Sequence, residues 1–129
     1  MQPKLLFSTV GIICMLFGIS LTFTPDLMGD QYLTNPQWIN AGARFVAQGW
    51  GTTLFAVGMA CWYARNAGPS LGRKAMILFI LVSNLALVVI SSIAVLNGVE
   101  TALGWAQALL AAGLAAWSGM LFRQETSVS

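Results

Sequence analysis

Four long stretches without a charged residue divide this chain, and they constrain its fold more than any other feature of the sequence. Each is about as long as the roughly 20 apolar residues that a helix needs to cross the hydrocarbon core of a bilayer. The four predicted spans are Leu5–Phe23, Phe45–Ala64, Ala75–Leu96 and Ala102–Phe122. Because they occupy most of the 129 residues, we expect one transmembrane domain, residues 1–129, with no separate soluble domain.

The composition excludes an ordinary soluble domain. Only 8% of the residues are charged and 57% are hydrophobic, whereas soluble domains carry about 25% charged residues. A chain of this size cannot bury so much apolar surface against itself, so membrane lipid is the expected solvent for much of it. The net charge of +2 is too small to indicate a nucleic-acid partner.

The basic residues predict how the spans are oriented. Cytoplasmic segments of membrane proteins carry an excess of Lys and Arg. If both termini are cytoplasmic, Arg44 is the one basic residue outside, and the five inside are Lys4, Arg65, Arg73, Lys74 and Arg123. We therefore expect an all-α, up-down-up-down four-helix transmembrane bundle in a bacterial inner membrane. The first span is expected to be retained, because its apolar run is longer than that of a signal peptide.

The outer connection between the first two spans is expected to be partly helical. The first span ends at Thr24–Pro25, because proline has no N–H for a helix interior. Asn35–Pro36 is a typical helix start and predicts a helix from Pro36 to Ala64 that projects beyond the membrane, tilts or kinks near Gly42. Asn97–Gly98 is expected to form the other outer turn. These short connections make spans one and two, and spans three and four, antiparallel neighbours.

The fourth span carries a stripe of small residues at three- or four-residue spacing. Small side chains let helices approach closely, and packing drives helix association in lipid. The stripe predicts contact with other helices of the same chain or, as the alternative, an interface in a homo-oligomer or a larger membrane complex. Its members are Gly104, Ala108, Ala112, Ala115 and Gly119. Two weaker glycine pairs, seven residues apart, are Gly11 with Gly18 and Gly51 with Gly58.

A group of polar residues is predicted near the outer face of the membrane. Arg44, Gln48 and Thr52 share one side of the second span, because they are four residues apart. The group could form a shallow pocket in which Arg44 holds an anionic group such as a lipid phosphate. Alternatively, Arg44 lies in solvent or pairs with an outer acid. The candidate binding residues are Arg44, Gln48, Thr52, Gln107, Asp26 and Glu100.

The third span contains an amide and several hydroxyls. Asn84 lies near its middle, where an unpaired amide is costly, so we expect it to hydrogen-bond across the bundle. Ser83, Ser91 and Ser92 can bond to backbone carbonyls of the preceding turn and are expected to carry no function.

The residues that the chain lacks narrow the possible chemistry. It has no histidine, which is the commonest general base and a frequent ligand of metals and haem. Its two cysteines cannot form a zinc or iron–sulfur site alone, and no carboxylate lies within a span. We therefore expect no metal, no cofactor, no catalytic residue and no enzyme activity.

The layout resembles that of small bacterial four-helix integral membrane proteins of unknown function. The resemblance rests on size, on Thr24–Pro25 at the end of the first span, on the basic inner loop, and on the second-span pattern Arg44, Gly51, Gly58 and Arg65. It covers the whole chain in outline. It implies a fold and a membrane location and carries no activity with it.

Three functions are compatible with this sequence. The first is a non-catalytic accessory, assembly or interaction subunit that works through helix packing in the bilayer. The second is the binding or transport of a lipid or small amphiphile at the outer polar pocket around Arg44. The third is a small oligomeric channel or permease with Asn84 along its path.

Overall fold

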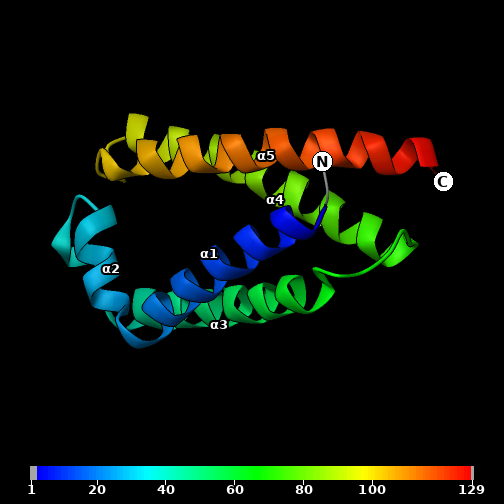
Figure 1. Cartoon of the computed structure of the whole chain (residues 1–129). Helices are drawn as coiled ribbons and strands as arrows, with labels where there is room; N and C mark the ends of the chain where they lie inside the picture. Colours follow the sequence, from blue (N-terminus) through cyan, green and yellow to red (C-terminus); the bar gives the residue numbers. More distant parts are fainter. Residues whose placement is uncertain (1–2, 129) are drawn as a thin grey trace.

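The computed structural model describes residues 3–128, with side chains as far as residue 125, and this part of the chain is all-helical (Figure 1). A short 3₁₀ turn, Pro36–Trp38, lies in the connection between the second and third α-helices. The α-helices are α1 (Pro3–Phe23), α2 (Pro25–Tyr32), α3 (Ala41–Ala64), α4 (Leu71–Leu96) and α5 (Leu103–Val128).

The four long helices form two antiparallel hairpins. In Figure 1, α1 packs along α3 in the lower pair and α4 packs along α5 in the upper pair. The predicted antiparallel neighbours are therefore confirmed. The beginning of α1 and the end of α5 lie at the same end of the molecule.

Three of the helices described over residues 3–128 are long and apolar enough to cross a membrane. They are α1, α4 and the Leu103–Glu125 part of α5. Large apolar side chains are exposed along them, including Leu16, Ile90 and Leu109, and such surface is stable only against hydrocarbon or another protein. The remaining long helix, α3, does not belong to this group, since its first half carries Arg44, Gln48 and Thr52.

The backbones of α1 and α3 approach each other closely at their glycines. Gly11 faces Gly58, and Gly18 faces Gly51, so both pairs with a seven-residue spacing meet in one antiparallel contact. A methyl group on Gly18 would lie 2.6 Å from the carbonyl oxygen of Gly51 and 2.6 Å from the backbone nitrogen of Phe55. These glycines, which the sequence indicated only weakly, therefore allow the tightest packing in the fold.

The small-residue stripe of α5 packs inside the chain. Gly104 lies against Val95 of α4, and Gly119 lies against Leu81 of the same helix. Ala108, Ala111 and Ala115 are buried, whereas Ala112 is exposed. Ala112 therefore does not pack within the chain, because the buried face follows a three-residue step from Ala108, and for Ala112 the alternative of an interface with another chain stays a prediction.

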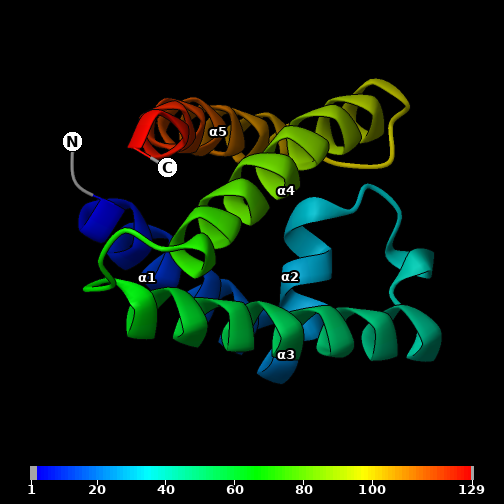
Figure 2. The same cartoon turned by 90° about the vertical axis from the view of Figure 1, so that its right-hand side faces the viewer.

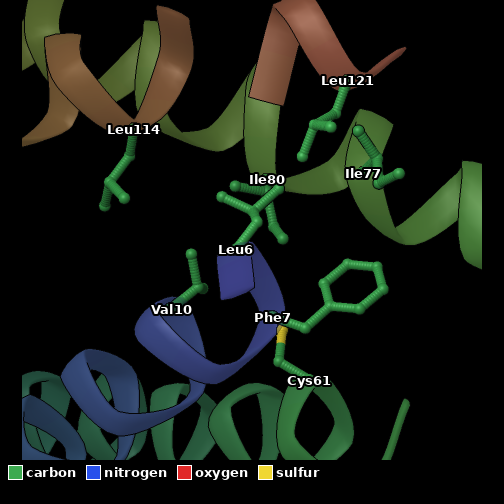
Figure 3. Packing of buried hydrophobic residues seen from close by; sticks show 8 residues of the cluster. All are labelled: Leu6, Phe7, Val10, Cys61, Ile77, Ile80, Leu114 and Leu121. Atoms are coloured by element: carbon green, nitrogen blue, oxygen red, sulfur yellow. The ribbon is translucent and has the colours of Figure 1, made fainter. Parts of the chain in front are cut away.

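The two hairpins meet mainly at one end, which we call the closed end. Figure 3 shows this core, to which all four long helices contribute. A largely buried ion pair between Arg73 and Glu125 joins the beginning of α4 to the end of α5 there. The core residues are Leu6, Phe7, Val10, Cys61, Ile77, Ile80, Leu114 and Leu121.

At the opposite, open end the hairpins separate and α2 lies between them. Figure 2 shows α3 and α4 diverging from their shared connection toward this end. Backbone bonds tie the segment after α2 to the α4–α5 turn: Thr101 donates to Tyr32 at 2.8 Å and Thr34 donates to Val99 at 3.0 Å. The all-helical fold expected from the sequence is thus built as two antiparallel hairpins, which contact each other through the core at the closed end and through α2 and these backbone bonds at the open end.

The outer connection differs from its prediction in where α3 begins. Asn35 caps only the 3₁₀ turn, by accepting a bond from the Gln37 N–H at 2.9 Å. The helix α3 starts at Ala41, with Asn40 as a second N-cap that accepts from the Ala43 N–H at 2.9 Å. A continuous helix from Pro36 is therefore wrong, while the partly helical outer connection is confirmed.

Candidate ligand cavity between the hairpins

A cavity of about 550 Å³ occupies the space where the two hairpins separate. This volume lies within the range of about 300–1,000 Å³ that is typical of small-molecule sites. The cavity exists because α1 and α3 contact α4 and α5 chiefly at the closed end, while α2 holds the open end together. Its apolar lining includes Phe17 and Leu21 of α1, Val46 and Trp50 of α3, and Leu87 and Ile90 of α4.

The lining of the cavity is partly exposed along α3 and α4. Lining residues from both helices are large, apolar and partly exposed: Val46 is 67% exposed, Trp50 is 48% exposed and Ile90 is 62% exposed. The same two helices diverge in Figure 2. Apolar side chains of these two long helices therefore contribute to the exposed part of the lining.

Arg44 and Asp26 form an ion pair at the rim of the cavity. The guanidinium donates two bonds to the carboxylate, from Nε to Oδ1 and from Nη2 to Oδ2, each 2.9 Å long. The bonded Arg44 holds the pKa of Asp26 below its ordinary value. Of the two alternatives for Arg44, the structure gives the internal ion pair, which joins α2 to α3.

Removing this ion pair is expected to have a small and acid-sensitive effect. Both side chains are about half exposed, and exposed pairs contribute little to stability. Folding lowers the pKa of Asp26, so the ionised carboxylate stabilises the folded state. This stabilisation is present above the ordinary Asp pKa of about 3.9 and is lost as pH falls through the lower folded value. We expect Asp26→Asn to lower the unfolding temperature slightly at pH 7. The difference from the wild type should vanish in acid, as thermal unfolding in detergent at both pH values would test.

The remaining predicted pocket residues divide into two groups. Gln48 donates to the Thr22 carbonyl of α1 at 3.2 Å, and the Thr52 hydroxyl donates to the Gln48 carbonyl at 2.9 Å. Both side chains make these hydrogen bonds within the α1–α3 hairpin, and both residues lie outside the cavity lining. Gln107 and Glu100 line the cavity together with Arg44 and Asp26. Four of the six predicted binding residues therefore converge on one site.

Glu100 lies in the α4–α5 turn and contributes a carboxylate to the cavity wall. Its Oε2 is buried and has no hydrogen-bond partner among the described residues. Burial raises the pKa of Glu100 above its ordinary value, and burial together with the charge of Glu100 raises the pKa of nearby Tyr32. Since it also lies against Gly104 at the beginning of α5, the carboxyl group is held in place.

Replacing Glu100 by glutamine is expected to stabilise the protein at neutral pH. Folding raises the pKa of Glu100, so protonation of Glu100 stabilises the folded state. This stabilisation is fully present below the ordinary Glu pKa of about 4.3 and is lost as pH rises through the folded value. Glutamine resembles the protonated form at every pH. We expect Glu100→Gln to raise the unfolding temperature by a few degrees at pH 7. The gain should shrink below about pH 4, and a gain that is equal at both pH values would contradict this reason.

Ser91 is a polar residue of the cavity wall that the sequence did not single out. It is fully buried on α4 and lines the cavity, and its Oγ has no hydrogen-bond partner among the described residues. The expected bond to the preceding turn is therefore absent in the structure. Other helical hydroxyls do make such bonds, as Ser20, Ser118 and Ser83 illustrate.

Asn84 also differs from its prediction. Its amide donates to the Ile80 carbonyl at 2.8 Å, one turn earlier in α4, and not across the bundle. The side chain is half-buried and is not part of the cavity lining. Its polar group is thus satisfied within its own helix.

The arrangement is suited to holding a molecule with a long apolar part and a small polar part. Both cysteines are free thiols, and the described residues contain no cluster of three potential metal ligands. No protein-family model, curated protein or solved structure matches this chain.

Proposed function

We propose that this chain is a membrane protein that binds a lipid or small amphiphile in the cavity between its two hairpins. The observation that carries the proposal is the cavity itself: about 550 Å³ of space, apolar on most of its surface, with a few polar side chains among its lining residues. Burial of apolar surface supplies the affinity for a chain-like ligand.

The ligand reaches this cavity from the hydrocarbon and not from water. The exposed lining residues Val46, Trp50 and Ile90 lie on the flanks of α3 and α4. At the water-facing end, the backbone bonds between the α2 segment and the α4–α5 turn close the route. A ligand dissolved in one leaflet could therefore move sideways between α3 and α4.

The membrane arrangement that goes with this function has four crossings. Although α3 carries more polar residues than its neighbours, it is 24 residues long, or about 36 Å at 1.5 Å per residue, and it packs along α1. The basic residues near the closed end favour a cytoplasmic position for that end in a bacterial inner membrane. The cavity then lies in the outer leaflet.

An accessory role through helix packing has less support from the arrangement of α5. Gly104, Ala108 and Ala115, which suggested a partner surface, pack within the chain. The cavity is a more specific observation than the stripe, so we favour ligand binding over the function of an accessory subunit or a channel.

Native mass spectrometry of protein extracted into lipid nanodiscs tests the proposal. After gentle release from the disc, we expect a chain that retains one amphiphile and loses it at higher collision energy than loosely attached lipid. A chain that never retains a stoichiometric adduct, over a range of release energies that leave it folded, would overturn the proposed function.

A further inference from the structure

The polar groups of the cavity are distributed unevenly. The wall formed by α1 and the cavity-facing part of α3 is apolar, with Phe17, Leu21 and Trp50. The wall formed by α4, α5 and their connecting turn carries Ser91, Glu100 and Gln107. Two buried atoms of that second wall, Ser91 Oγ and Glu100 Oε2, have no partner among the described residues.

Unpaired buried polar atoms are costly, and each is normally matched by a partner. Ser91 lies in a helix where its hydroxyl could bond to a carbonyl of the preceding turn, as Ser83 does. Glu100 has no basic partner among the described residues, although its carboxylate lies in the wall of a cavity. Both atoms thus lack a partner within the described part of the chain and belong to residues that line the cavity.

The charges around the cavity disfavour an acidic head group. Arg44 is the lining residue that could attract an anion, but its charge is balanced by the two-bond ion pair with Asp26. An anion on the opposite wall would face the carboxylate of Glu100, and two like charges in a poorly solvated site repel strongly. This reverses the expectation of an anionic lipid group held by Arg44.

We propose that the ligand is a neutral amphiphile whose polar end is a hydroxyl group, held on the α4–α5 wall by Ser91 and Glu100 with its alkyl chain against α1 and α3. The proposal rests on the proposed function and specifies its ligand class. A hydroxyl can donate to the Glu100 carboxylate and can also exchange a bond with the Ser91 hydroxyl. It satisfies both atoms without the desolvation cost that an ammonium group carries.

Competition among ligands of one chain length tests the head group. The protein in nanodiscs is first loaded with a bromine-terminated alkyl alcohol, whose bromine quenches nearby tryptophan fluorescence. The part of the quenching that Trp50→Phe removes reports occupancy of the cavity. Dodecanol, dodecane, dodecanoate and dodecylamine are then added at pH 7, with concentrations corrected for partition into the disc.

Dodecanol is expected to displace the probe at a concentration at least about tenfold lower than dodecanoate or dodecane, because a site with buried polar groups rejects analogues that leave them unpaired. Ser91→Ala should reduce the preference for dodecanol over dodecane, and Ser91→Thr should restore it. Ser83→Ala is the matched control, since Ser83 bonds to Ile80 and lies outside the cavity lining. Glu100→Gln should weaken the discrimination against dodecanoate.

The two proposals fail in different ways. Dodecanoate, dodecane or dodecylamine that competes as well as dodecanol would overturn the hydroxyl proposal and leave ligand binding intact. Quenching that is the same in the wild type and in Trp50→Phe would overturn the cavity as a ligand site.

Discussion

Replacing Gly18 by alanine is expected to destabilise the α1–α3 hairpin by about 1–3 kcal/mol, the usual cost of overpacking a close contact. The added methyl group would meet three backbone atoms of α3, the nearest at 2.6 Å. Backbone cannot move aside as a flexible side chain can, so α1 and α3 must separate. Gly51→Ala should act in the same way, because its methyl group would lie 2.8 Å from the Gly18 carbonyl oxygen.

Reversible unfolding in mixed detergent measures this effect, with Gly49→Ala and Gly113→Ala as matched controls. Each control glycine lies in a long helix, with nothing within 4 Å of where the new methyl group would lie. Their substitution should leave stability unchanged or raise it by up to about 1 kcal/mol, since alanine favours the helix. Equal effects at Gly18 and Gly49 would show that α1 and α3 do not approach as described.

Filling the cavity is expected to abolish ligand binding without unfolding the protein. Ala47 of α3 and Ala94 of α4 line the cavity from its two sides, so the double variant Ala47→Phe/Ala94→Phe places two rings in the space of the alkyl chain. We expect the affinity for dodecanol to fall by at least about tenfold, or about 1.4 kcal/mol. The tryptophan-quenching titration described above measures this loss.

The matched control is the double variant Ala60→Phe/Ala86→Phe, on the same two helices. Both alanines are exposed and lie outside the cavity lining, so the added rings extend into lipid. This variant should bind dodecanol as the wild type does. A cavity-filled variant that keeps full affinity, while its unfolding is unchanged, would mean that the ligand binds elsewhere.

The helical fold was largely predictable from the sequence because the bilayer sets a length scale. Uncharged stretches of about 20 residues predict long apolar helices. Each predicted span falls on one long helix of the structure: α1, α3 and α4 begin two to four residues earlier than predicted, whereas α5 begins one residue later and continues to Val128. The beginning of α3 was not predicted, because Asn35–Pro36 and Asn40 are both good caps. Only tertiary contacts decide which of the two begins the long helix.

The tight contact between α1 and α3 was underestimated for a different reason. Its four glycines are spaced by seven residues on each of two helices, and only their antiparallel register brings Gly11 to Gly58 and Gly18 to Gly51. The more continuous stripe on α5 was the stronger pattern in the sequence. It nevertheless packs against side chains of α4 and not against its backbone: a methyl group added to Gly119 would lie 3.6 Å from Leu81, and one added to Gly104 would lie 2.5 Å from the side chain of Val95.

The cavity could be predicted only in its polar part. Asp26, Arg44, Glu100 and Gln107 were expected near one another from their depth in the membrane, and all four line the cavity. Its apolar walls depend on how far two hairpins separate, which no local pattern encodes. Ser91 was dismissed because a helical serine usually bonds to its own helix, and the sequence contains no signal that this one does not.

The most direct test of the account is methyl-detected NMR of the protein with a bound dodecyl chain in deuterated detergent. Cross-relaxation between the chain protons and the methyl groups of both Leu21 and Leu87 is expected, because these residues line the cavity from opposite hairpins. Contacts with outward-facing methyl groups such as those of Leu109, and none with Leu21 and Leu87, would contradict a ligand held between the hairpins.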